Sequence, residues 1–212
     1  MPCGGSVGKL AFGQLWALNA ETLPPGKGIP LHAHENMEII SIPLSGTLRH
    51  QDSRGAAHIM APGDIHVLSA GLGVTHWEYN HSPNEPAHYL QAWISPKSRM
   101  TPTRYAQGTL VDGDGGLCLI AAPHGHDSVV EINQDAFVSL ARLPPGIALQ
   151  YSKYGKANGL HVFVIEGRLD IGGRELAGGC GLSLAGRELP VLQVLAPSRV
   201  LCIEVPLQPL SD

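Results

Sequence analysis

The sequence predicts an almost entirely β fold, and three observations support that prediction. Glycine (26) and proline (17) together make up about a fifth of the 212 residues, which is typical of short strands joined by turns. Short apolar runs are separated by turn signals roughly every eight to twelve residues. No amphipathic pattern of helical period continues beyond a few turns. This rhythm favours a β-sandwich or a β-barrel.

The composition is that of a compact globular protein. The chain is 43% hydrophobic and 15% charged, and its 212 residues allow one large or two small all-β domains with real cores. The formal net charge is −4 and no block of Lys or Arg stands out, so we expect no electrostatic binding to nucleic acid or to an anionic membrane. We find no leader peptide and no apolar run that could span a bilayer, and a cytoplasmic protein is the expectation.

The first half reads as a series of strands closed by turn residues. The expected strands are residues 10–22 (one or two strands), 37–44, 47–51, 58–60, 64–69, 74–80 and 87–94. Residues 95–107 then form a polar connection rich in Pro, Lys and Arg. We therefore expect two domains, residues 1–108 and residues 109–212.

The second half repeats the pattern of the first. Pro144-Pro145-Gly146 resembles Pro24-Pro25-Gly26, and each is followed by a second glycine after a similar interval. That interval is 20 residues from Gly26 to Gly46 and 21 residues from Gly146 to Gly167. The near-equal spacing indicates an internal duplication.

Two polar pairs in the first half predict a metal site. His32 and His34 form one pair, and His76 and Glu78 form the other. On a strand, residues i and i+2 point to the same face, and inward-facing residues of a barrel converge on its axis. Three imidazoles and a carboxylate suit a divalent first-row metal: iron, nickel, copper, zinc, manganese or cobalt. Four ligands would saturate tetrahedral zinc in a structural role, whereas a six-coordinate metal would keep positions open for catalysis.

Each pair has an ordinary alternative, because a lone His-x-His in a strand is more often an exposed or hydrogen-bonded pair than a ligand pair. His124-Gly125-His126 lies in an expected loop, and we interpret it as surface. Glu38 could be a ligand or could orient a histidine N–H. The remaining histidines in polar or strand-edge positions are interpreted as structural or solvent-facing: His50, His58, His66, His81 and His88.

Around these pairs the sequence resembles the pirin family of bicupins. The resemblance runs through residues 12–107 and is carried by three motifs: His32-Ala33-His34-Glu35-Asn36-Met37-Glu38, Gly46-Thr47-Leu48-Arg49-His50-Gln51-Asp52-Ser53 and Thr75-His76-Trp77-Glu78-Tyr79-Asn80. The second half is similar in layout alone. The resemblance implies two cupin barrels, with one metal in the N-terminal barrel held by His32, His34, His76 and Glu78. Iron is the metal expected first.

The resemblance also implies a function. Bacterial pirin-like quercetinases open a flavonol ring with O₂, so we expect a metal-dependent dioxygenase acting on a small aromatic enol, with Glu78 as general base. The alternative is a non-enzymatic metal-binding protein that acts through a protein partner, as eukaryotic members do. The chain differs from the family in lacking an aromatic-rich N-terminal segment, which leads us to expect a differently shaped pocket. Tyr151-Ser152-Lys153 stands where the first half has His-x-His, so we expect no second metal.

Overall fold

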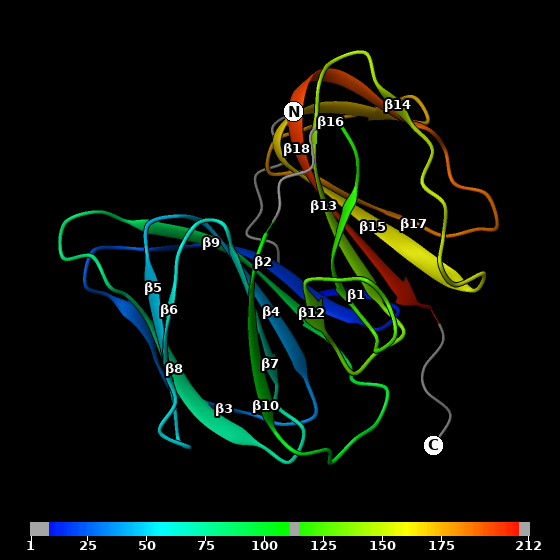
Figure 1. Ribbon diagram of the computed structural model, residues 1–212. Coiled ribbons are helices and arrows are strands. Elements are labelled where there is room, and N and C mark those ends of the chain that lie inside the picture. The colour runs from blue at the N-terminus through cyan, green and yellow to red at the C-terminus, as the bar shows by residue number, and fades with distance from the viewer. Residues whose placement is uncertain (1–8, 111–114, 208–212) are drawn as a thin grey trace.

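The structure is a computed structural model that describes residues 9–110 and 115–207. These residues form strands, turns and bends, and none of them lies in a helix that could cross a membrane. The prediction of an all-β fold is therefore confirmed for the described part of the chain (Figure 1).

The strands fall into an earlier and a later group along the chain. The earlier strands are β1 (Lys9–Phe12), β2 (Leu15–Leu23), β3 (Gly28–His34), β4 (Glu38–Ser45), β5 (Leu48–Asp52), β6 (Ala57–Met60), β7 (Asp64–Ser69), β8 (Val74–Asn80), β9 (Ala87–Ile94) and β10 (Arg104–Thr109). The later strands are β11 (Cys118–Ala122), β12 (Val130–Glu131), β13 (Phe137–Leu143), β14 (Ala148–Leu149), β15 (Asn158–Ile171), β16 (Arg174–Ala177), β17 (Gly181–Leu184) and β18 (Leu192–Pro206).

Three sheets organise these strands. Sheet A has the order β1-β2-β9-β4-β7-β10, and sheet B has the order β3-β8-β5-β6. Sheet C has the order β12-β11-β13-β18-β15-β16, with β14 added on β18 and β17 on β15. No hydrogen-bonded ladder between described strands joins the earlier group to the later one. The division after residue 108 stays a prediction, since β10 continues to Thr109 and the next described strand begins at Cys118.

The turn glycines of the two halves share one backbone requirement. Gly46 follows β4 with a φ of +72°, and Gly167 lies in a bent part of β15 with a φ of +91°. A Cβ atom on Gly46 would lie 2.7 Å from the Cα atom of Ala87, and one on Gly167 would lie 2.6 Å from the Cα atom of Ser198. Both positions therefore exclude larger side chains, which fits the duplication expected from the sequence.

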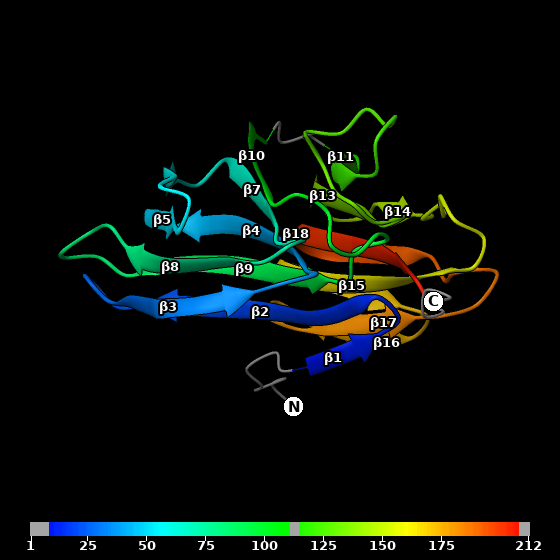
Figure 2. The same ribbon diagram turned by 90° about the horizontal axis from the view of Figure 1, so that it is seen from below.

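Figures 1 and 2 show sheet A of the first half lying beside sheet C of the second. One large apolar core includes residues of both halves. Residues on one face of sheet A pack there against residues of sheet C: among them are Ile40, Ile65, Leu90, Ile120, Val138 and Leu201. Both faces of β4 are buried for that reason, which explains why most of its residues are apolar. One face of sheet A therefore lines the first barrel, and its other face packs against the second half.

The interiors of the two barrels differ in chemistry. The second barrel is filled by a cluster of apolar side chains that includes Leu160, Val162 and Leu192. Among its described residues, the first barrel has two small apolar clusters, around Tyr89 and around Ile39. The remaining space between sheets A and B holds buried polar side chains, and these form the candidate site.

Candidate metal centre

The candidate site lies on two neighbouring strands of sheet B. His32 and His34 belong to β3, His76 and Glu78 belong to β8, and the antiparallel register places His32 directly opposite His76. The burial of β8 alternates along its length, with His76 and Glu78 both on the buried face. Strand geometry therefore brings the two pairs to the same face of the sheet, inside the first barrel.

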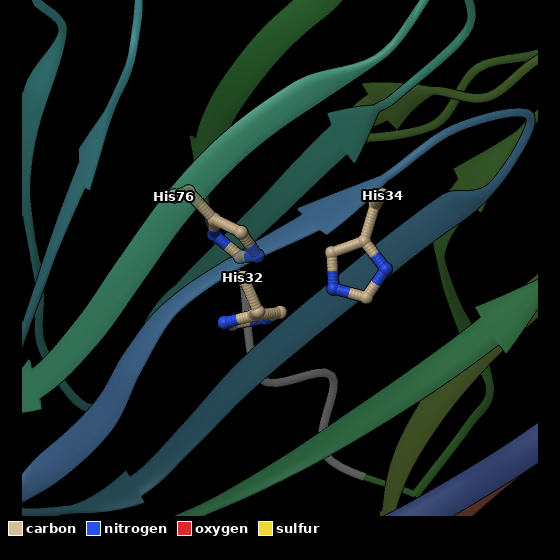
Figure 3. A group of neighbouring side chains, drawn as sticks. All are labelled: His32, His34 and His76. Atoms are coloured by element: carbon tan, nitrogen blue, oxygen red, sulfur yellow. The ribbon is translucent and has the colours of Figure 1, made fainter.

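Three imidazoles converge there (Figure 3). The ring centroids lie 4.4 Å apart for His32 and His76, 4.8 Å apart for His32 and His34, and 5.1 Å apart for His34 and His76. One ligand atom from each ring lies within 4.8 Å of those of the others. His76 is buried, whereas His32 and His34 are half-buried. The group is thus open on the side of β3.

Hydrogen bonding selects the nitrogen that His32 can offer to a metal. Its Nδ1 atom lies 2.8 Å from the carbonyl oxygen of Pro30. A carbonyl only accepts, so Nδ1 must carry the proton and donate it, which leaves the lone pair on Nε2. Such a bond to the second ring nitrogen is the usual way in which a metal-binding histidine is oriented.

Glu78 lies close to His76, which also belongs to the group of three imidazoles. Its side chain is 3% exposed, and it forms a second close group with His76 and His50, whose ligand atoms lie within 4.8 Å of one another. The two groups share His76, so each of the four residues proposed from the sequence belongs to one or both groups. The donor atoms of all four do not lie within 4.8 Å of one another.

His50 is the residue that the sequence interpretation missed. It lies on β5 directly opposite Glu78, and its Nδ1 atom is 3.2 Å from Nδ1 of His76 and 4.0 Å from Oε1 of Glu78. A signal was present in the sequence, because His50 and Asp52 are themselves a polar i, i+2 pair on a strand. The sequence predicts a structural or solvent-facing His50, whereas the structure shows it buried in the second group of close donors.

Burial sets the charge state of these groups. Burial, with the neighbouring His32, His50 and His34, lowers the pKa of His76 to about 3, and burial followed by His32 lowers the pKa of His34 to about 4. Both rings are therefore neutral at pH 7, the form that binds metals. Burial raises the pKa of Glu78 to about 7, and a hydrogen bond from Gln91 opposes that rise.

The donor set fits a divalent transition metal. Neutral imidazoles with a carboxylate are the ligands that such metals prefer. Within the described residues, Nε2 of His76 is buried and has no hydrogen-bond partner. A buried ring nitrogen without a partner is costly unless something else binds it, and a metal ion would do so.

The other candidate residues lie elsewhere. Glu38 accepts hydrogen bonds from Ser69 Oγ (2.7 Å) and from the Asn133 amide (3.2 Å), and it belongs to neither group of close donors, so the structure does not support a role for it at the metal site. Asn36, with a φ of +48°, interrupts the strand after His34 and changes which face Glu38 occupies.

Among the remaining histidines, His124 and His126 are exposed, as expected. His66 is bonded to the Tyr105 hydroxyl, and His58 stacks on the Tyr105 ring at 3.7 Å. Nδ1 of His88 lies 2.8 Å from the Thr22 hydroxyl.

Two barrels in one chain, with histidine and carboxylate donors close together inside the first, define a bicupin with a candidate metal site. Residues 8–94 match the family described as Pirin, and residues 119–205 match the family described as Quercetinase C-terminal cupin domain. The chain belongs to the pirin family, and the bicupin fold predicted from its sequence is confirmed.

Relatives and solved structures agree with this assignment. A Mycobacterium tuberculosis protein, named provisionally as a quercetin 2,3-dioxygenase, is 36% identical over 200 residues, which cover 91% of this chain and 80% of that protein. The Escherichia coli quercetin 2,3-dioxygenase is 35% identical over 126 residues, which cover 59% of this chain and 54% of that protein. The bacterial pirin YhhW of E. coli in complex with nickel(II) has a TM-score of 0.86 at 28% identity, covering 92% of this chain and 83% of that one.

Proposed function

We propose that this protein is a metal-dependent dioxygenase that opens a flavonol or a related enol with O₂. The observation that carries the proposal is the convergence of three imidazoles beside a buried carboxylate within one barrel. Relatives named as quercetin 2,3-dioxygenases support the choice of reaction.

We propose His32, His34, His76 and Glu78 as the residues that hold the metal. A bound divalent metal would supply Lewis acidity toward the enolic oxygen of the substrate. Iron is the metal we propose first, and nickel is the next candidate because a similar structure contains it. Metal analysis of protein purified without a histidine tag tests the choice.

Glu78 is the proposed catalytic base. It is the one acidic residue in either group of close donors found among the described residues. Burial raises its pKa to about 7, so near neutral pH its carboxylate can accept the hydroxyl proton of a flavonol. The half-buried His32 and His34 mark the side from which a substrate would approach. The apolar lining of the barrel around His34 includes Trp93, whose ring lies 5.1 Å away.

The experiment is reconstitution of metal-free protein with iron, nickel, cobalt, manganese or copper, followed by measurement of quercetin and O₂ consumption in equal amounts. His76→Ala should abolish consumption. His124→Ala should not, because His124 is 91% exposed and far from the barrel interior. Tight metal binding without any consumption of quercetin would contradict the proposal and favour the non-enzymatic, partner-binding role.

A further inference from the structure

A buried chain of hydrogen bonds leads away from Glu78 across the barrel to sheet A. Gln91 on β9 is 5% exposed, and its Nε2 atom donates to Oε2 of Glu78 at 3.0 Å. Its Oε1 atom accepts from the indole Nε1 of Trp93 at 2.8 Å. Gln91 and Trp93 are i and i+2 on β9, so they share the face that lines the first barrel.

The chemistry of the indole determines the orientation of the Gln91 amide. An indole N–H can only donate, so the amide atom that faces Trp93 must be the oxygen. The NH₂ group then faces Glu78, and the same nitrogen also lies 3.2 Å from Ser41 Oγ. Both amide hydrogens and the amide oxygen therefore have partners, and reversal of the amide would place its NH₂ group against the indole N–H and its oxygen against the Glu78 carboxylate.

This arrangement makes the two oxygens of Glu78 different. Oε2 is occupied by the Gln91 donor, whereas Oε1 faces the histidine side, 4.0 Å from His50 Nδ1. A bound metal would therefore be offered Oε1, the oxygen of Glu78 that Gln91 does not hold.

Trp93 also contacts a second residue of the site. Its ring meets the His34 ring edge to face, at 5.1 Å between centroids and 80° between planes. This geometry is favourable for aromatic pairs. One tryptophan therefore holds His34 directly and Glu78 through Gln91.

We propose that Gln91 and Trp93 are positioning residues, which fix Oε1 of Glu78 as the oxygen available to the metal and hold the His34 ring in place. The inference rests on the proposed function only in requiring that the site binds a metal.

Two substitutions distinguish the role of the Gln91 amide from that of the Trp93 N–H. Gln91→Met keeps the approximate volume and removes all three hydrogen bonds, so the metal affinity should fall 10- to 100-fold, as is usual when a partner of a ligand is lost. Trp93→Phe keeps a ring against His34 and removes only the N–H that orients the amide. Its loss of affinity should be clearly smaller than that of Gln91→Met.

The affinity is measured by competition between metal-free protein and a chelator for Zn²⁺, and the ligand geometry is followed in the visible absorption spectrum of the Co²⁺-loaded protein. Gln91→Met should change both quantities. The matched control is Gln134→Met, since Gln134 is a buried glutamine bonded to Ser95 O and to the Asp135 amide, away from the site. It should change neither the affinity nor the spectrum, and cooperative thermal unfolding of each metal-free variant identifies those that fold.

The outcomes distinguish this inference from the proposed function. If the wild type binds Zn²⁺ and Co²⁺ tightly and folded Gln91→Met matches it in affinity and spectrum, the positioning role is refuted and the metal site stands. If folded Trp93→Phe matches the wild type in affinity and spectrum, the orienting role of the indole is overturned. If the wild type binds no metal, both proposals fail.

Discussion

We predict that ionisation of Glu78 lowers the free energy of unfolding of the metal-free protein at neutral and alkaline pH. Its folded-state pKa is about 7, raised by burial from the usual 4.5. The unfolded chain gives up this proton at lower pH than the folded protein does. Stability from this group is therefore fully present below pH 4.5 and is lost as the pH rises through 7. Glu78→Gln removes the ionisable group and should remove this loss.

The size of the effect follows from the two pKa values. Each tenfold change in a proton-binding constant corresponds to about 1.4 kcal/mol, so the difference between 4.5 and about 7 amounts to roughly 3 kcal/mol at pH 8 and above. An amide oxygen at this position can still accept the hydrogen bond from Gln91. We therefore expect Glu78→Gln to be more stable than the wild type by about 2–3 kcal/mol at pH 8, without metal, and to bind metal poorly.

Urea denaturation of metal-stripped wild type and Glu78→Gln at pH 5 and pH 8 measures this difference. Glu204→Gln is the contrasting control, because Glu204 is fully buried but accepts hydrogen bonds from the Tyr154 and Gly155 amides and from Asn158 Nδ2. It should be destabilised at pH 8. The reasoning would be refuted if Glu78→Gln were no more stable than the wild type at pH 8.

Three further predictions concern the fold and the metal. Gly46→Ala should lower the free energy of unfolding by at least about 2 kcal/mol in urea, because of its positive φ and the close approach of Ala87. Burial lowers the pKa of His161 to about 4, so wild-type stability should fall as the pH drops from 6.5 to 4, and His161→Gln should show about 3 kcal/mol less of that fall. Stripping the metal from protein saturated about 100-fold above Kd should lower the Tm by about 5–10 °C, as measured by calorimetry.

The pairing of residues i and i+2 was sufficient to predict the core of the site. Strand alternation is a local property, so His32 with His34 and His76 with Glu78 could be assigned to one face each from the sequence. The register that places His32 opposite His76 could not be read from the sequence, because it depends on which strands become neighbours. The resemblance supplied that missing information.

The errors around the site have physical causes. The spacing from His34 to Glu38 predicts a shared face only if the strand is unbroken, but the left-handed backbone at Asn36 separates β3 from β4 and the two strands join different sheets. His50 stands among polar residues, which favours a structural or solvent-facing interpretation, and its contact with His76 arises from the pairing of β5 with β8. The His50–Asp52 pair indicates a shared face, but the sequence does not show which strand pairs with β5.

β3 lies at an edge of sheet B, since β8 is its only partner among the described strands, and its ladder is irregular between Ile29 and His32. A metal ion bound by His32, His34 and His76 would link β3 to β8 and stabilise the pairing of the two strands. If β3 separates from the metal-free protein, the backbone of β8 becomes a template on which a strand of another chain can pair. Metal supply would then influence how readily newly made protein aggregates in the cell, independently of any turnover.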